Sequence, residues 1–345
     1  MNINAPLSIR RRMGLEIFRR LENERTEEHQ LKQLFWECTL RCNLHCRHCG
    51  SDCKKIAGHP DMPKEDFLRV LDSVSAQNDP HKIFVIITGG EPLMRKDLEE
   101  CGRAIYERGF PWGMVTNGLY MTRERLNGLL DAGLHTATVS LDGFATDHNW
   151  MRGNPQSFER AVEAIKLMVQ VPDFVFDVVT CVNKHSYMRL EELKDFLISL
   201  GVKGWRLFTI FPVGRAAKDP ELQLSNEEFR GVMEFIRKSR KEGRIHVSYG
   251  CEGFLGNYEA EVRDTFFACR AGISVGSVLI DGAISACPSI RADYHQGNIY
   301  ENDFMEVWNH RFKPYRDREW MKKDECADCK YFRFCLSLIH ISEPT

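Results

Sequence analysis

Strand and helix patterns alternate six times along the chain between residues 33 and 241, and this alternation constrains the fold more than any other feature. The expected strands lie at 33–38, 82–88, 111–116, 135–141, 174–182 and 204–211, and the expected helices at 63–77, 96–108, 122–132, 156–170, 187–200 and 225–241. Repeated strand–helix units imply a parallel sheet covered by helices, and right-handed crossovers curl such a sheet into part of a barrel. The sequence therefore predicts an α/β fold with a partial (β/α)6 barrel, whose site is built from the loops that follow the strands.

The flanking regions follow other patterns. Residues 8–24 read as a basic amphipathic helix that we expect to pack on the barrel or to remain solvated. After residue 242 the regular alternation ends, and 275–285 reads as a hairpin with Asp281-Gly282 at its turn. We therefore divide the chain into an N-terminal arm (1–32), the partial barrel (33–242), a small cysteine-rich module (243–335) and a tail (336–345).

Composition excludes several classes of protein. The 47 basic and 49 acidic residues give a formal net charge of −2, so no nucleic-acid partner follows from charge. No apolar run approaches membrane-spanning length, and the N-terminus has no signal-peptide pattern, so we expect a cytoplasmic protein without a transmembrane segment. Thirteen cysteines in such a reducing compartment indicate metal ligation rather than disulfides.

The densest cysteine group follows the first expected strand. Cys42, Cys46 and Cys49 stand in the run Cys-Asn-Leu-His-Cys-Arg-His-Cys, with three residues between the first pair and two between the second. Three close thiolates can hold three irons of a [4Fe-4S] cluster and leave the fourth iron open to chelate a ligand. The alternative is a zinc site, which usually needs a second close cysteine pair or histidines at matched spacing.

A glycine-rich turn follows the second expected strand, as Thr88-Gly89-Gly90-Glu91-Pro92. Glycines let the backbone approach a ligand closely, and the Glu91 carboxylate can accept a hydrogen bond from an ammonium group. The cysteine run and this turn, in this order, resemble the radical S-adenosylmethionine (SAM) enzymes. In that family the open iron binds the amino and carboxylate groups of SAM, and the Gly-Gly-Glu motif hydrogen-bonds its amino group.

The resemblance assigns further residues to SAM binding. Ser140 at the end of the fourth strand is expected to contact the SAM carboxylate, and Arg152 in the following loop to pair with it. Asn117 after the third strand is expected to face the ribose or the substrate. His48 takes the place where relatives have an aromatic residue against adenine. The loop 212–216 resembles the one that closes the SAM pocket.

The C-terminal cysteines resemble the SPASM extension of radical SAM enzymes, which binds up to two auxiliary [4Fe-4S] clusters. The resemblance assigns Cys269 and Cys287 to the first cluster, and Cys326, Cys329 and Cys335 to the second. A zinc knuckle is the alternative for the last three. The pattern requires a further cysteine at position 339, where this chain has Ile339. The tail 336–345 resembles a translated sequencing adapter, so we expect the natural sequence to continue differently beyond residue 335.

Five other cysteines stay outside these assignments, among them Cys53, which follows the cysteine run. Cys38, Cys101 and Cys181 are expected to be small buried hydrophobic residues. Cys251 is either a cluster ligand, a substrate-facing thiol or a structural residue.

The resemblance implies reductive cleavage of SAM to methionine and a 5′-deoxyadenosyl radical, which abstracts hydrogen from an unactivated carbon. The cofactors carry this chemistry, so no catalytic acid, base or nucleophile is assigned. A flavodoxin or ferredoxin is the expected electron donor, and a peptide or protein side chain the expected substrate. The alternatives are a tetrapyrrole or haem-pathway enzyme, and a non-catalytic iron–sulfur electron carrier. An intact Gly89-Gly90-Glu91 weighs against the carrier, which has no need to bind SAM.

Overall fold

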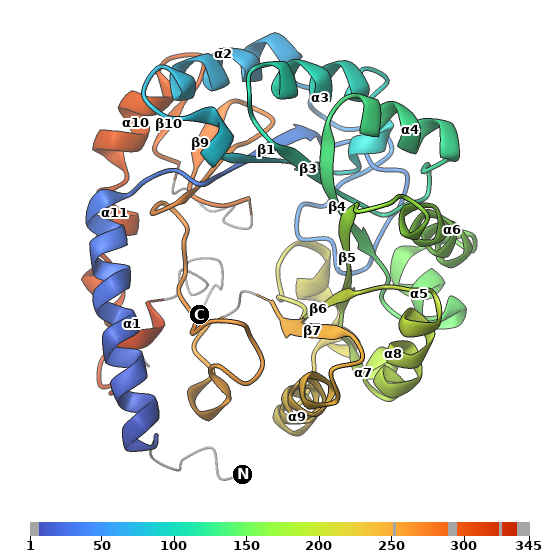
Figure 1. Ribbon diagram of the computed structural model, residues 1–345, viewed down its shortest axis with the longest axis vertical. Coiled ribbons are helices and arrows are strands. Elements are labelled where there is room, and N and C mark those ends of the chain that lie inside the picture. The colour runs from blue at the N-terminus through green and yellow to red at the C-terminus, as the bar shows by residue number, and fades with distance from the viewer. Residues whose placement is uncertain (1–6, 251–252, 289–294, 324–325, 337–345) are drawn as a thin grey trace.

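The computed structural model describes residues 7–250, 253–288, 295–323 and 326–336, and within them ten strands form one sheet (Figure 1). The strand order is β10-β9-β8-β1-β2-β3-β4-β5-β6-β7, and all neighbouring pairs from β1 to β7 are parallel. These seven strands are β1 (Gln33–Thr39), β2 (Phe84–Gly89), β3 (Trp112–Thr116), β4 (Leu134–Ser140), β5 (Val175–Cys181), β6 (Gly204–Phe208) and β7 (His246–Tyr249). The predicted α/β partial barrel is confirmed, and β7 extends it by one strand that the sequence analysis did not predict.

Helices cover the outer face of this curved sheet, as Figure 1 shows. They are α2 (Lys64–Ser75), α3 (Leu98–Glu107), α4 (Arg123–Asp131), α6 (Ser157–Val169), α8 (Leu190–Ser199) and α9 (Asn226–Glu242), each within one of the predicted helical regions to within a residue. Two shorter helices, α5 (Ala145–Arg152) and α7 (Lys184–Tyr187), lie in the loops after β4 and β5. The sequence analysis had treated the segment that forms α5 as loop.

The main core lies between the strands and these helices. Successive strand residues point to opposite faces, so the fully buried Val139, Val178 and Trp205 all face the helices. The ring of Trp36 on β1 stacks on Phe67 of α2, with ring centroids 4.5 Å apart. Burial of such large side chains fixes which face of each strand points inward, and therefore which residues line the inside of the barrel.

The C-terminal region extends the same sheet. β8 (Val275–Val278) pairs in parallel with β1, while β9 (Ala283–Ser285) and β10 (Gly297–Asn298) add antiparallel strands. The predicted hairpin at 275–285 is thus present, with Gly282 in its turn at a φ of 84°. Its pairing with β1 was not predicted, because a short hairpin carries no sequence signal for its distant partner.

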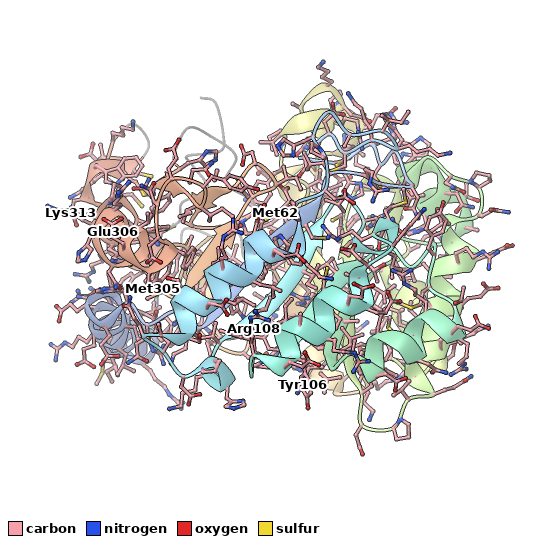
Figure 2. The ribbon with its side chains drawn as sticks, turned by 90° about the horizontal axis from the view of Figure 1, so that it is seen from above. Met62, Tyr106, Arg108, Met305, Glu306 and Lys313 are labelled. Carbon is pink, nitrogen blue, oxygen red and sulfur yellow. The ribbon has the colours of Figure 1, made fainter. Side chains whose placement is uncertain are left out.

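Short helices follow the hairpin, and α10 (Phe304–Arg311) packs beside α2, as Figure 2 shows from above. The backbone N–H of Met305 donates to the Ser73 hydroxyl at 3.4 Å, and the Asn309 amide donates to Gln77 at 3.1 Å. Two further short helices are α11 (Lys313–Arg316) and α12 (Phe332–Cys335). The C-terminal region is therefore attached to the barrel through both its hairpin and α10.

The predicted N-terminal helix is present as α1 (Ile9–Glu28), but it contacts the C-terminal region rather than standing free. Arg11 forms an ion pair with Glu261 at 2.6 Å, and the rings of Phe18 and Phe266 meet edge to face at 5.6 Å. Glu16 also pairs with Arg333 of α12. Among the described helices, none has the length and apolar character required to cross a bilayer.

Candidate SAM and iron–sulfur site

The loop after β1 carries the three cysteines of the predicted cluster. Cys42 and Cys46 are each 8% exposed, and Cys49 is partly exposed beside them. The backbone N–H of Cys42 donates to the Lys54 carbonyl at 2.8 Å, which closes the loop, and that of Arg47 donates to Met151 at 2.8 Å. These two hydrogen bonds thus hold the cysteine loop at its start and at its middle.

The thiol environments suit a metal ligand set. Burial raises the pKa of Cys42 to about 12 and raises that of Cys46. A hydrogen bond from Cys53 lowers the pKa of Cys49 to about 5. Buried thiols resist ionisation on their own, whereas a bound metal removes their protons outright. Three buried or half-buried thiols on one short loop therefore fit an iron–sulfur cluster, and Cys53 is an additional neighbour that the sequence analysis did not single out.

The two glycines after β2 lie directly against the cysteine loop. A Cβ atom on Gly89, whose φ is 137°, would come within 2.1 Å of the Thr39 carbonyl oxygen, and one on Gly90 within 2.3 Å of the Arg41 carbonyl oxygen. Both contacts are backbone to backbone: Gly90 N–H donates to Thr39 at 2.7 Å. No other residue fits here, so the glycines join the end of β2 to the start of the cysteine loop.

Glu91 is buried and serves the turn after β3. Its carboxylate accepts hydrogen bonds from the Thr116 hydroxyl at 2.7 Å, the Asn117 backbone at 2.7 Å and the Leu93 backbone at 3.1 Å. Burial raises its pKa, and these bonds oppose that effect. A carboxylate offers about four acceptor positions, so three are used and one remains for a ligand.

Asn117 lies between Glu91 and the cysteine loop. Its side-chain N–H donates to Asn43 at 2.8 Å and lies 3.9 Å from the Cys42 sulfur. Its side-chain oxygen accepts from the Leu119 backbone at 2.9 Å. The structure therefore brings Asn117 beside a predicted cluster ligand.

Arg152, at the end of α5, is buried beside the cysteine loop. Its Nε donates to Asp142 at 2.6 Å, and its Nη1 lies 3.8 Å from the Cys46 sulfur. Burial alone would raise the pKa of Asp142, but the guanidinium holds it at about 2. Asp142 also accepts from the Cys181 backbone at 3.0 Å. In the sequence Asp142 reads as part of a turn, so its role as the partner of Arg152 was not predicted.

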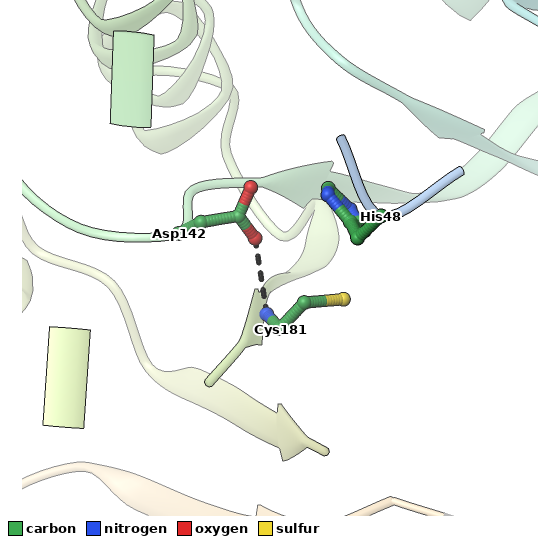
Figure 3. A group of neighbouring side chains, drawn as sticks. All are labelled: His48, Asp142 and Cys181. Atoms are coloured by element: carbon green, nitrogen blue, oxygen red, sulfur yellow. Dashed lines mark hydrogen bonds between the residues drawn. The ribbon is translucent and has the colours of Figure 1, made fainter. Parts of the chain in front are cut away.

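His48 faces the same pair from the cysteine loop. A ring nitrogen of His48, a carboxylate oxygen of Asp142 and the sulfur of Cys181 all lie within 4.8 Å of one another (Figure 3). Because Arg152 already neutralises Asp142, this group has little attraction for a cation. Burial lowers the pKa of His48 to about 4, so the imidazole is neutral, and its buried Nδ1 has no hydrogen-bond partner among the described residues. That orphaned atom is consistent with a site that receives a polar ligand such as the adenine of SAM.

Ser140 is the last residue of β4. It is partly buried and lies in register with Val179 of β5.

The loop 212–216 lies over the cysteine loop. Gly214 has a φ of 59°, and a Cβ there would come within 2.5 Å of the Cys49 carbonyl oxygen. Arg215 donates to the Cys46 carbonyl at 2.7 Å and to Asp52 at 2.7 Å. Arg215 is a residue whose anchoring role no sequence pattern revealed.

The cysteines of the C-terminal region are less enclosed. Cys269, Cys287, Cys326 and Cys335 are partly exposed and Cys329 is exposed. The buried Arg318 guanidinium donates to the carbonyls of Cys269, Ala271 and Leu336, at 3.0, 2.8 and 2.6 Å. It joins the segment of Cys269 to the segment that ends at Cys335, a role the sequence did not indicate. Cys251 and residues 337–345 of the predicted non-native tail, Ile339 among them, lie outside the described residues.

The remaining cysteines divide into two groups. Cys38 and Cys101 are fully buried in the main core, as predicted. Cys181 instead is partly exposed and lies beside His48 and Asp142, facing the site.

Comparison with protein families gives two matches. The model described as the radical SAM superfamily matches residues 36–197, and the iron–sulfur cluster-binding domain SPASM matches residues 269–330. The first range contains the cysteine loop, the Gly-Gly-Glu turn and Arg152. The second contains four of the five C-terminal cysteines assigned above.

Curated relatives are similar over most of the chain. The AdoMet-dependent heme synthase of Methanosarcina barkeri is 27% identical over 322 residues, 87% of this chain and 88% of its own length. The Fe-coproporphyrin III synthase of the same organism is 28% identical over 87% of this chain and 81% of its own length. The PqqA peptide cyclase of Rhizobium meliloti is 23% identical over 85% of this chain and 78% of its own length.

Among solved structures, Streptococcus suis SuiB bound to S-adenosylmethionine superposes with a TM-score of 0.69 at 19% identity, over 90% of this chain and 74% of that one. At this identity the likeness supports the fold alone.

Proposed function

Because the chain belongs to the radical SAM superfamily and carries a SPASM domain, we propose that Cys42, Cys46 and Cys49 hold its SAM-binding [4Fe-4S] cluster. The observation that carries the proposal is that Glu91, through Asn117, and Arg152 both meet this one cysteine loop. When bound, the cluster and SAM together supply a 5′-deoxyadenosyl radical that abstracts hydrogen from the substrate.

The protein's own residues position SAM and exclude water. We propose that the remaining acceptor position of Glu91 receives the SAM ammonium, and that Arg152 and Ser140 bind its carboxylate. Asp142 holds the Arg152 guanidinium in place through the 2.6 Å ion pair. The neutral His48 ring and Asn117 offer polar contacts to the nucleoside. The loop 212–216, held by Arg215, covers the cysteine loop.

A tetrapyrrole is the substrate class that the curated relatives favour. Two curated relatives, each similar to this chain over 87% of its length, are named as a heme synthase and a coproporphyrin synthase. We therefore propose that the abstracted hydrogen comes from a tetrapyrrole side chain. A peptide side chain, the substrate implied by the sequence resemblance, is the second candidate, and the similarity to a peptide cyclase favours it.

The proposals are tested in two steps. The anaerobically reconstituted protein is incubated with dithionite and SAM, and 5′-deoxyadenosine is measured; its absence would contradict the proposed activity. Tetrapyrrole and peptide candidates are then added, and the products are analysed by mass spectrometry. A loss of hydrogen or carbon dioxide from a tetrapyrrole supports the first substrate class, and a mass change confined to a peptide supports the second. For electron supply in the cell we propose a flavodoxin or ferredoxin.

A further inference from the structure

The inside of the barrel carries a charged layer level with the predicted SAM site. Ser140, Val179 and Arg206 are in register across β4, β5 and β6. Their neighbours Val139, Val178 and Trp205 are buried against the outer helices, so these three residues face the inside of the barrel. Neighbouring strands are about 4.8 Å apart, which puts the Cα atom of Arg206 roughly 10 Å from that of Ser140.

The Arg206 guanidinium is held in a defined orientation. Its Nε and Nη2 both donate to the Asp177 carboxylate, Nη2 at 3.1 Å, and Nη2 also donates to the Thr138 hydroxyl at 2.9 Å. Thr138 in turn donates to Asp177 at 2.7 Å. Asp177 therefore occupies one edge of the guanidinium in a bidentate pair, the geometry that most restricts an arginine side chain.

The opposite edge of the same guanidinium is open. Nη1 of Arg206 has no hydrogen-bond partner in the part of the chain that the structure describes, and the side chain is 41% exposed. The ring of Phe208 lies beside it, 5.9 Å from the guanidinium carbon. Gly204, next to Asp177, leaves this part of the wall without a side chain.

Such a cluster is unusual inside a barrel. Closed barrels fill this layer with branched apolar side chains, whereas this partial barrel has a partly exposed ion pair there. An ion pair that only interacts with solvent would not need a fixed orientation, nor a hydrogen bond from the guanidinium to a threonine hydroxyl. A guanidinium held on one edge and open on the other is instead prepared to bind a planar anion.

We propose that Nη1 of Arg206 binds a carboxylate of the substrate, with Asp177 and Thr138 as positioning residues. The inference rests on the proposed function and adds that the substrate is an anion anchored on β6, two strands from the predicted SAM contacts of β4. A propionate of a tetrapyrrole and a carboxylate of an acidic peptide share this chemistry.

The test compares Arg206→Gln with the wild type and with Arg244→Gln. Arg244 is a surface arginine paired with Asp195, so its substitution removes the same charge away from the barrel interior. All three proteins are reconstituted, and the dissociation constant of coproporphyrin III is measured by quenching of porphyrin fluorescence. Arg206→Gln should weaken binding about ten- to a hundredfold, while Arg244→Gln leaves it unchanged.

Two arms identify the source of the carboxylate. In the first, coproporphyrin III is compared with its methyl ester; in the second, a glutamate-containing peptide is compared with its glutamine analogue. The wild type should prefer the free acid in one arm, and Arg206→Gln should abolish that preference. The absence of an Arg206-dependent preference in both arms, whether or not the probes bind, would overturn the proposal.

A third measurement separates this proposal from the proposed function. SAM cleavage without substrate does not involve Arg206, so Arg206→Gln should form 5′-deoxyadenosine at the wild-type rate. If the wild type forms none, the proposed function fails. If both proteins cleave SAM equally and Arg206→Gln still binds both probes as the wild type does, only the anion site is wrong.

Discussion

The cysteine loop of the barrel and the cysteines of the C-terminal region are supported in different ways. Cys42 and Cys46 are buried, Asn117 and Arg152 reach their sulfur atoms from the loops after β3 and β4, and a continuous apolar core lies between the barrel strands and the helices. Cys326, Cys329 and Cys335 instead lie in or near the four-residue helix α12, where Cys329 is exposed and the other two are partly exposed. The comparison suggests that the barrel builds its site before the cluster binds, whereas the C-terminal region depends on its clusters for order.

The largest expected effect is on the stability of the C-terminal region when iron is removed. Hydrogen exchange is measured on the apo and the reconstituted protein. Amides of residues 269–336 should gain strong protection on reconstitution, because bound clusters would cross-link cysteines that are far apart in the chain. Strands β2 to β5 should change little, since their core is independent of the metal. Equal gains in protection in the barrel strands and in the C-terminal region would show that the two regions do not differ in their dependence on the clusters.

The second prediction concerns the buried carboxylate of the barrel site. Glu91→Gln keeps the shape of the side chain but removes the charge that would pair with the SAM ammonium. A charge-assisted hydrogen bond contributes roughly 1.5–3 kcal/mol, so SAM affinity should fall about ten- to a hundredfold. Equilibrium dialysis measures the affinity, and iron content checks that the cluster is retained. Unchanged affinity with a full cluster would refute this role of Glu91.

The third prediction sharpens the account of the C-terminal region. Arg318→Met removes a buried guanidinium and leaves up to four carbonyls without this donor, which should cost about 1–3 kcal/mol locally. Limited proteolysis should show faster cleavage within 269–336 and an unchanged barrel. Arg311→Met, an exposed arginine paired with Glu306, is the matched control. If the two variants are cleaved alike, Arg318 does not join the two segments.

The smallest expected effect is the pH dependence of the barrel. His148 is buried, and burial lowers its pKa to about 3, whereas an unfolded histidine titrates near 6.5. The folded protein thus keeps His148 neutral, so its stability is full above pH 6.5 and falls as the pH decreases toward 3. Between pH 7 and 5.5 the loss is about 1 kcal/mol.

Urea unfolding of the wild type and of His148→Gln at these two pH values measures that difference. Glutamine can still accept the hydrogen bond that the Asp142 backbone N–H donates to His148 at 2.9 Å. The variant should lose less stability than the wild type on acidification. An identical pH dependence would show that His148 does not titrate in this way.

Much of the fold could be predicted because strands and helices alternate with clear apolar periods. The cysteine run and the Gly-Gly-Glu turn were also visible, since each is a local pattern that follows a strand. Parallel strands place their C-terminal ends at one edge of the sheet, so these loops had to meet. That reasoning needed no knowledge of distant contacts.

The parts that sequence did not reveal depend on pairs of residues far apart in the chain. The pairing of β8 with β1, the bond from Arg215 to Cys46 and the role of Arg318 are examples. A single arginine among many carries no local signal for its partner. Asp142 was hidden for a different reason, because an Asp-Gly pair after a strand is an ordinary turn signal.

The most direct test of the central claim compares SAM cleavage in the wild type and in Cys46→Ala. Cys46 lies between the other two predicted ligands in the chain and 3.8 Å from Arg152, so its loss should prevent a stable cluster. Cys38→Ala, a buried cysteine outside the loop, is the control. Both proteins are reconstituted anaerobically, reduced with dithionite and assayed for 5′-deoxyadenosine. The account predicts production by the wild type and Cys38→Ala and none by Cys46→Ala, and undiminished production by Cys46→Ala would contradict it.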